Sequence, residues 1–228
     1  MSRAKKLAIR IGIGGALLLS VWILLRPGCQ VLNQIARQNS LKTLGMALHS
    51  YHDEFRSFPP AVVVDENGRA MHSWRALMTL HLRDEFKGAS EFRHEYRFDE
   101  PWNSESNRAL QRQHWFEDVT HFVAIVGERT MWPPSGCRSI REVKDGTSNT
   151  ILVVYYPQSK IHWLEPNDLH FDGSTVYALD GDKRIPVNLA GCLVLTADGM
   201  FMTLPSNTSQ ETISALLTID GGEKIPNW

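Results

Sequence analysis

The segment from Asp145 to Thr150 combines side chains whose oxygens suit a calcium ion with a glycine that allows close backbone approach. Asp145 and Asn149 are the candidate metal ligands in it. The same residue types also form turns in which polar side chains bond their own backbone ahead of a strand. We favour the turn, and the sequence therefore predicts no metal site here.

A second candidate cation site pairs Asp198 with Asn188. Asp198-Gly199 is, however, a dipeptide that two-residue hairpin turns prefer, and the flanking residues Cys192 to Leu204 are typical of a hairpin. The turn explains both residues of the dipeptide without a ligand.

Three further side chains, His49, His52 and Asp53, are spaced so that a helix would bring them together. A divalent metal could bridge them. With three potential ligands and no fourth, we favour a solvated or sheet-packed helix face, and we expect no cofactor.

Catalytic motifs are absent from the sequence. It contains no Gly-x-Ser-x-Gly elbow, no His-Glu-x-x-His pair and no phosphate-binding loop. The carboxylates of Glu165 and Asp168 near His162 form the cluster with most catalytic potential, although a structural role is the simpler interpretation. We therefore expect no enzyme activity.

Large aromatic residues offer another type of site, because aromatic faces bind sugars and peptides. Trp74, Trp102, Trp132 and Trp163 could form such an exposed platform. Core packing is the commoner fate of large aromatic side chains, and we favour it.

The N-terminal region reads as a membrane anchor. Residues 11–25 contain no charge, and extending the segment back to Leu7 gives 19 residues, close to the roughly 20 that a helix needs to cross a bilayer. We expect a basic tail at residues 1–6 and a transmembrane helix at 7–25. Gly12 and Ala16 form a small-xxx-small pair that could pack two membrane helices together.

Basic residues set the expected orientation. Four of them precede the apolar segment and two follow it shortly afterwards, which favours a cytoplasmic N-terminus and an exported domain. The expected location is therefore the bacterial inner membrane, as a single-pass protein with a periplasmic domain. A cleaved signal peptide and lipidation at Cys29 are the two alternatives.

Charge is unevenly distributed along the chain. The net charge is -1, yet no acidic residue precedes Asp53, so the basic end suits anionic lipid. The acidic remainder argues against a nucleic-acid partner. In an oxidising compartment Cys137 and Cys192 could pair, and free buried thiols are the alternative.

A helical stalk is expected to follow the membrane segment, over residues 26–56. Its apolar residues recur in steps of three and four at Leu41, Leu44, Leu48, Tyr51 and Phe55. The helix should end before Pro59-Pro60 and pack one face on the domain.

The remaining residues, 57–228, are expected to form one α+β domain. The predicted strands and helices are a strand at 62–64 leading to an Asn67-Gly68 turn, a helix capped by Ser73, a helix at 104–114, strands at 122–126 and 150–156, the hairpin at 192–204, and a helix capped by Thr208 and Glu211 and ending at Leu217.

Several segments in this order closely resemble the DUF1559 family, abundant in planctomycete-type bacteria and similar to type IV pilins and pseudopilins. They are Leu41 to His52, Ser57-Phe58-Pro59-Pro60, His72-Ser73-Trp74-Arg75, Asp99-Glu100-Pro101-Trp102-Asn103, Asp145 to Val153 and Ala197-Asp198-Gly199. The resemblance covers residues 29–222.

The resemblance implies a pilin-like fold, in which a long N-terminal helix, part anchor and part stalk, packs on an antiparallel sheet. It also implies a structural or interaction role in the envelope or secretion apparatus, with pilin-like or secretion-system proteins as partners and without established catalysis. Self-association is left open. The alternative function is an envelope ligand-binding module for a metal or a glycan.

The chain departs from the family pattern at several positions. Asn188 replaces a family histidine, Tyr155 replaces an acidic residue, and no glutamate precedes Glu54. Prepilin-type processing and glutamate-guided filament assembly therefore do not follow from the resemblance.

Overall fold

The computed structural model describes residues 31–82, 89–110 and 119–223. The expected basic tail and membrane helix, with Gly12, Ala16 and Cys29, lie outside these residues. Among the helices of the described ranges, none is long and apolar enough to cross a bilayer. The chain divides between Ser40 and Leu41 into two units, and both four-stranded sheets belong to the second.

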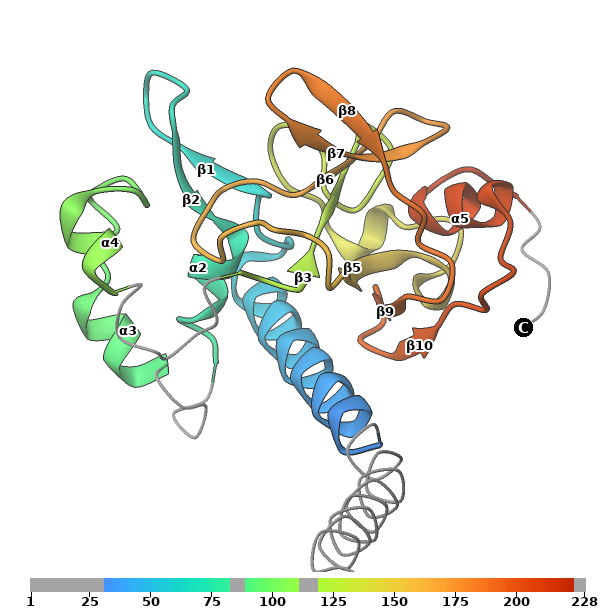
Figure 1. Ribbon diagram of the computed structural model, residues 1–228, viewed down its shortest axis with the longest axis horizontal. Coiled ribbons are helices and arrows are strands. Elements are labelled where there is room, and N and C mark those ends of the chain that lie inside the picture. Colours follow the sequence, from blue (N-terminus) through green and yellow to red (C-terminus); the bar gives the residue numbers. More distant parts are fainter. Residues whose placement is uncertain (1–30, 83–88, 111–118, 224–228) are drawn as a thin grey trace, which may run out of the picture. The chain divides into compact units, whose positions relative to one another are not determined.

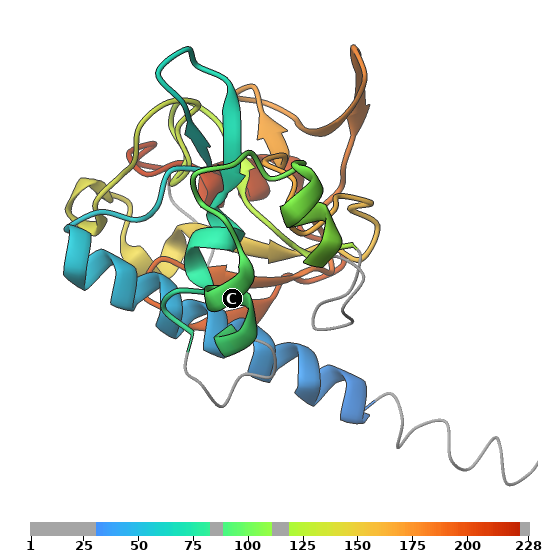
Figure 2. The same ribbon diagram turned by 90° about the vertical axis from the view of Figure 1, so that its left-hand side faces the viewer.

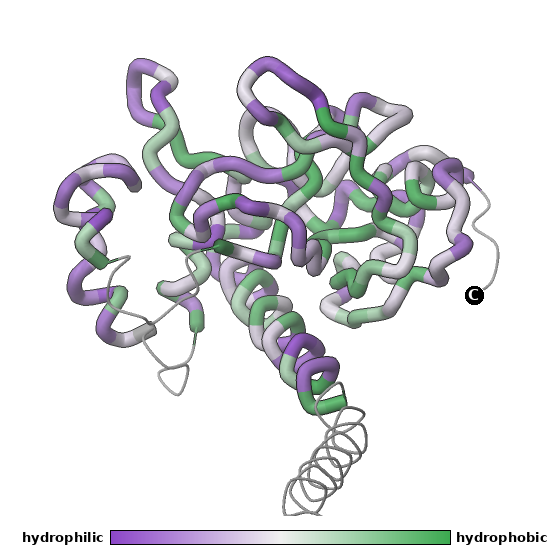
Figure 3. The backbone as a smooth tube through the Cα atoms, viewed as in Figure 1, coloured by the Kyte–Doolittle hydropathy of each residue, from purple (hydrophilic) through white to green (hydrophobic). Residues whose placement is uncertain are grey.

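The expected stalk helix is present over residues 31–55. It ends at Arg56, which adopts a left-handed conformation with φ of 61° and whose amide donates to the His52 carbonyl. Apolar and polar residues are interspersed along this helix (Figure 3), and its buried residues Leu41, Gly45 and Leu48 recur in steps of four and three, as an amphipathic helix requires.

The first sheet has four antiparallel strands in the order β10-β9-β5-β3 (Figure 1). Their bounds are β3 (Phe122–Val123), β5 (Ile151–Tyr155), β9 (Leu193–Thr196) and β10 (Phe201–Thr203). β9 and β10 form the predicted hairpin, with Gly199 at a φ of 84° in its turn. The fold is thus α+β, as expected.

Helix residues from Leu41 onward lie against one face of this sheet (Figure 2). Leu41 and Leu48 are fully buried in the same cluster as Leu195 of β9. A Cβ added at Gly45 would lie 3.0 Å from a Leu195 methyl group, so the absent side chain allows the helix to approach the strand closely.

The opposite face of the sheet is covered by α5 (Gln210–Leu217). Successive strand residues point to opposite faces, so Val194 packs with α5 while its neighbour Leu195 packs with the N-terminal helix. The cap of α5 is Ser209, whose hydroxyl accepts from the Thr212 amide at 3.2 Å, one residue after the predicted Thr208.

A second sheet has the order β4-β6-β7-β8, with β4 parallel to β6 and the other pairs antiparallel. The bounds are β4 (Ile125–Val126), β6 (Leu169–Phe171), β7 (Val176–Asp180) and β8 (Lys183–Pro186). The single strand predicted at 122–126 is therefore wrong, because β3 and β4 belong to different sheets. Between them, the Ala124 amide donates to the Asp168 carboxylate at 2.7 Å rather than to a strand.

A two-stranded hairpin precedes the first short helix. β1 (Val62–Val64) pairs with β2 (Ala70–Ser73) across the predicted turn, where the Asp65 carboxylate accepts from the amides of Asn67 and Arg69. The Ser73 hydroxyl accepts from the Ala76 amide, which confirms the predicted cap of α2 (Trp74–Met78).

Two helices, α3 (Ala89–Glu95) and α4 (Glu105–Leu110), lie beside one another on the α2 side of the domain (Figure 1). Phe92 and Leu110 share a small apolar cluster with Trp163. Buried Asn107 bonds the backbone between Arg97 and Pro101 through four hydrogen bonds. The second half of the helix predicted at 104–114 lies outside the described residues. Two 3-10 turns, Ile140–Glu142 and Thr147–Asn149, complete the described elements.

Candidate functional site

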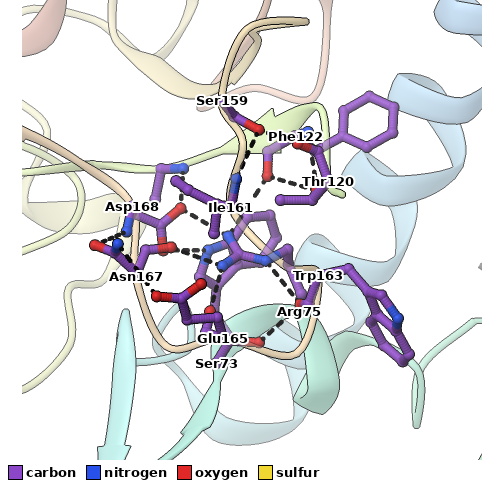
Figure 4. A network of polar contacts seen from close by, with 12 residues as sticks. Ser73, Arg75, Thr120, Phe122, Ser159, Ile161, Trp163, Glu165, Asn167 and Asp168 are labelled. Carbon is purple, nitrogen blue, oxygen red and sulfur yellow. Dashed lines mark hydrogen bonds and ion pairs between the residues drawn. The ribbon is translucent and has the colours of Figure 1, made fainter. Parts of the chain in front are cut away.

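Arg75 and Asp168 form a buried ion pair in the interior of the domain (Figure 4). Arg75 Nη1 lies 2.7 Å from Asp168 Oδ1, and the two side chains are 6% and 1% exposed. Arg75 comes from α2 and Asp168 directly precedes β6, so the pair joins elements that are 93 residues apart.

The remaining donors of Arg75 all bind main-chain carbonyls. Nε donates to Trp163 O at 3.1 Å, Nη2 donates to Glu165 O and Asn167 O at 2.8 Å each, and Nη1 also approaches Phe122 O at 3.5 Å. The planar guanidinium thus fixes the whole loop from residue 163 to 168 against β3.

Asp168 is as fully bonded as its partner. Its carboxylate accepts from Ala124 N at 2.7 Å and from Trp74 Nε1 at 3.1 Å. Burial raises the pKa of the Asp168 carboxyl from its ordinary value, while the charge of Arg75 and these donors oppose that rise. Such a pair is costly to break, because either partner alone would be a buried, unpaired charge.

The side chains of His162 and Glu165 accept hydrogen bonds from main-chain amides of their own loop. Glu165 Oε2 accepts from the His162 amide at 3.4 Å, and His162 Nδ1 accepts from the Leu164 amide at 3.2 Å. Together with Asp168, these side chains hold the loop in shape.

A pocket of about 270 Å³ lies beside this network. Asn167 and Asp168 contribute one side, and the rings of His170 on β6 and Tyr177 on β7 stack with centroids 5.5 Å apart. Burial, followed by the nearby Arg184 charge, lowers the pKa of His170, so its imidazole is neutral at neutral pH. The other lining residues are Ala61, Val62, Val126, Gly127, Glu128, Pro134, Pro166 and Phe171. The lining is therefore mainly apolar, with polar groups from Glu128, Asn167, Asp168, His170 and Tyr177.

The candidate cation ligands at Asp145 and Asp198 each bind backbone. Asp145 accepts from the amides of Gly221 and Gly222 at 2.6 and 2.8 Å, and Asn149 donates to the Asp145 carbonyl at 3.2 Å. Asp198 accepts from Thr196 Oγ1 at 2.6 Å and from the Met200 amide at 3.1 Å.

These two loops do lie side by side, since Asp198 N donates to Thr147 O at 3.2 Å. Asn188 instead accepts from the Ala190 amide at 3.0 Å. Within the described ranges, no group of three or more His, Cys, Asp or Glu residues could hold a metal ion. The observed bonding is that of backbone-binding turns.

The helical histidines also pack internally. His52 Nε2 accepts from the Ile140 amide at 3.2 Å, and burial lowers the pKa of His52. His49 lies against Phe58 and Gly199, and its Nε2 is buried without a hydrogen bond. Asp53 is exposed. The three side chains therefore do not form a ligand set.

The four candidate tryptophans, all within the described residues, do not form an exposed platform. Trp74, Trp132 and Trp163 are buried and Trp102 is half-buried, so core packing is the correct interpretation. Cys137 is exposed, Cys192 is half-buried, and both are free thiols.

Residues 35–135 match the model of a family described as "Protein of unknown function (DUF1559)". Arg75 lies inside the matched segment, and its partner in the buried ion pair, Asp168, lies beyond the end of that segment. Comparison with curated proteins gave no match, and comparison with solved structures gave none either.

Proposed function

We propose that this chain, a DUF1559 family member over residues 35–135, is a membrane-anchored, exported protein with a structural or interaction role in the cell envelope or secretion apparatus. The domain is proposed to act as a pilin-like module without catalysis. Its proposed location is the bacterial inner membrane, with the N-terminus in the cytoplasm.

The packing of helix residues 41–55 on an antiparallel sheet is the observation that carries this proposal. In sequence, this helix follows the segment that we expect to anchor the protein, which is the order of elements that a pilin-like chain requires. The buried face of residues 41–55 fixes this part of the helix to the domain.

The internal use of polar side chains supports a non-catalytic role. Arg75, Asp145, Asp168 and Asp198 bind backbone or one another, rather than pointing together into a shared cleft. Their geometry favours rigidity, which suits a module that presents a surface.

Mild cross-linking and affinity capture of the full-length protein from its native membrane test the proposal. We expect recovery of pilin-like or secretion-apparatus proteins, and we expect Leu18→Arg to abolish it because an arginine in mid-bilayer costs about 2.5–3.5 kcal/mol of insertion free energy. Leu18→Ile, which keeps the segment apolar, should behave as wild type.

Equal recovery by Leu18→Arg at matched protein amounts would contradict the role of the anchor. Recovery of the protein alone, as a detergent-soluble monomer, would favour the second candidate function, a ligand-binding module. The pocket beside His170 and Tyr177 is the observation that favours it.

A further inference from the structure

Two of the edge strands of the four-stranded sheets, β8 and β10, have opposite character. β8, an edge strand of the second sheet, carries Lys183, Arg184 and Pro186, and all of its residues are exposed. Charged side chains and proline on an edge are the means by which proteins prevent pairing with another strand. The β8 edge is therefore protected.

β10, an edge strand of the first sheet, carries no charged side chain and no proline. No charged residue occurs between Gly199 and Gln210, and Met200 is 66% exposed. Thr203 is also exposed, while Phe201 and Met202 are half-buried. An uncharged, partly apolar edge is a template for strand addition.

The ladder between β9 and β10 fixes which main-chain groups face outward. Thr196 N donates to Met200 O at 2.8 Å and Leu204 N donates to Cys192 O at 2.9 Å. The bonding main-chain groups of Met200 and Leu204 therefore face β9. Because main-chain groups alternate in direction along an antiparallel strand, the N–H and C=O groups of Phe201 and Thr203 face away from β9. The amides of these two residues therefore point to the side of β10 that is away from β9.

We propose that this edge binds the same edge of a second copy of the chain, with the two β10 strands antiparallel and centred on Met202. Phe201 of each copy would then lie opposite Thr203 of the other, and each pair would exchange two N–H···O bonds. The two sheets would become one continuous sheet.

A second copy fits this edge better than a charged partner does. An uncharged strand meets its own copy without repulsion, and a two-fold contact uses the same patch twice. The inference rests on the proposed function in one respect, because anchors in one membrane would raise the local concentration of copies.

The register is determined by the neighbours of β10. Shifting the centre to Thr203 would place Phe201 opposite Pro205, which has no amide hydrogen. Shifting it to Phe201 would place Thr203 opposite Gly199, which lies in the hairpin turn at a φ of 84°. Centring on Met202 avoids both positions.

Disulfide cross-linking of Met202→Cys in the full-length chain tests the register. The chain would carry Cys29→Ser, Cys137→Ser and Cys192→Ser, and would be oxidised in its native membrane. A central pair that is not hydrogen-bonded has Cα atoms about 4.5 Å apart, within the range that a disulfide spans. We expect most of the protein to migrate as a disulfide-linked dimer on a non-reducing gel.

Ile185→Cys on the β8 edge is the matched control, and we expect it to remain monomeric. No dimer with Met202→Cys, or equal cross-linking of both variants, would overturn the inference. If capture recovers envelope partners while Met202→Cys stays monomeric, the dimer is refuted and the proposed function is not.

Thr203→Lys provides the second variant. Its side chain is exposed, so the fold of the single copy should persist, with an unchanged melting temperature. In the Met202→Cys background it should reduce the dimer at least tenfold by placing a charge on the edge, whereas Thr203→Val should retain it. Undiminished cross-linking by Thr203→Lys would contradict pairing through β10.

Discussion

Arg75→Met is expected to lower the free energy of unfolding by about 3–5 kcal/mol, because it leaves the buried Asp168 carboxylate without its charge partner. It also removes the donors that hold the carbonyls of Trp163, Glu165 and Asn167. Urea denaturation of the detergent-purified chain, followed by tryptophan fluorescence, measures the change.

The loss in Arg75→Met should depend on pH. Burial raises the folded-state pKa of Asp168, and removing Arg75 removes the leading influence that opposes this rise. Above the unfolded-state pKa of about 3.9 the unfolded carboxyl ionises freely, so stability falls as pH rises towards the raised folded-state pKa. The deficit relative to wild type should therefore be smaller at about pH 5 than at about pH 7.5.

Arg75→Met combined with Asp168→Asn is the control for this pH dependence. The double variant has no ionisable group at the pair, so Asp168 no longer contributes to the pH dependence of its stability. A deficit in Arg75→Met that is below about 1 kcal/mol would show that the pair is not buried as described.

Leu48→Ala is the second large effect, with an expected loss of about 2–5 kcal/mol in the free energy of unfolding. Leu48 is fully buried where the N-terminal helix meets the first sheet, so its truncation leaves a cavity. The same urea titration measures it.

Met46→Ala is the matched control on the same helix, because Met46 is 50% exposed. We expect it to change stability by no more than about 0.5 kcal/mol. Similar losses for the two variants would contradict the assignment of the packed face of the helix.

The elements that could be predicted from the sequence are those that short-range patterns specify. The spacing of Leu41, Leu44 and Leu48 indicates the helix and its buried face, and Asp198-Gly199 indicates the hairpin turn. Ser73 indicates the cap of α2. Each of these signals lies within a few residues of the structure that it specifies.

The features that were missed depend on contacts between distant residues. The strand predicted at 122–126 divides because Asp168, 44 residues away, takes the Ala124 amide. β6, β7 and β8 were not predicted. β8 is exposed throughout and ends in a proline, so its sequence shows no alternation of apolar and polar residues. The pocket, which includes two rings from β6 and β7, was missed with them.

The sequence indicated one of the two residues of the buried ion pair. Asp168 stood out with His162 and Glu165, but its actual partner is Arg75, 93 residues earlier. One available signal was the position of Arg75 in the run from Trp74 to Met78, where it stands among apolar residues that a short helix would bury. The bond from Asp145 to Gly221 and Gly222 spans 76 and 77 residues and has no local signal.

Protease accessibility of a C-terminal epitope in spheroplasts tests the central claim, that the domain is exported on an N-terminal anchor, most directly. We predict that added protease destroys the epitope in spheroplasts while a cytoplasmic marker stays intact, and that the chain remains in the membrane fraction. An epitope that resists protease until detergent is added would contradict the proposed orientation, and a chain released into the soluble fraction would contradict the anchor.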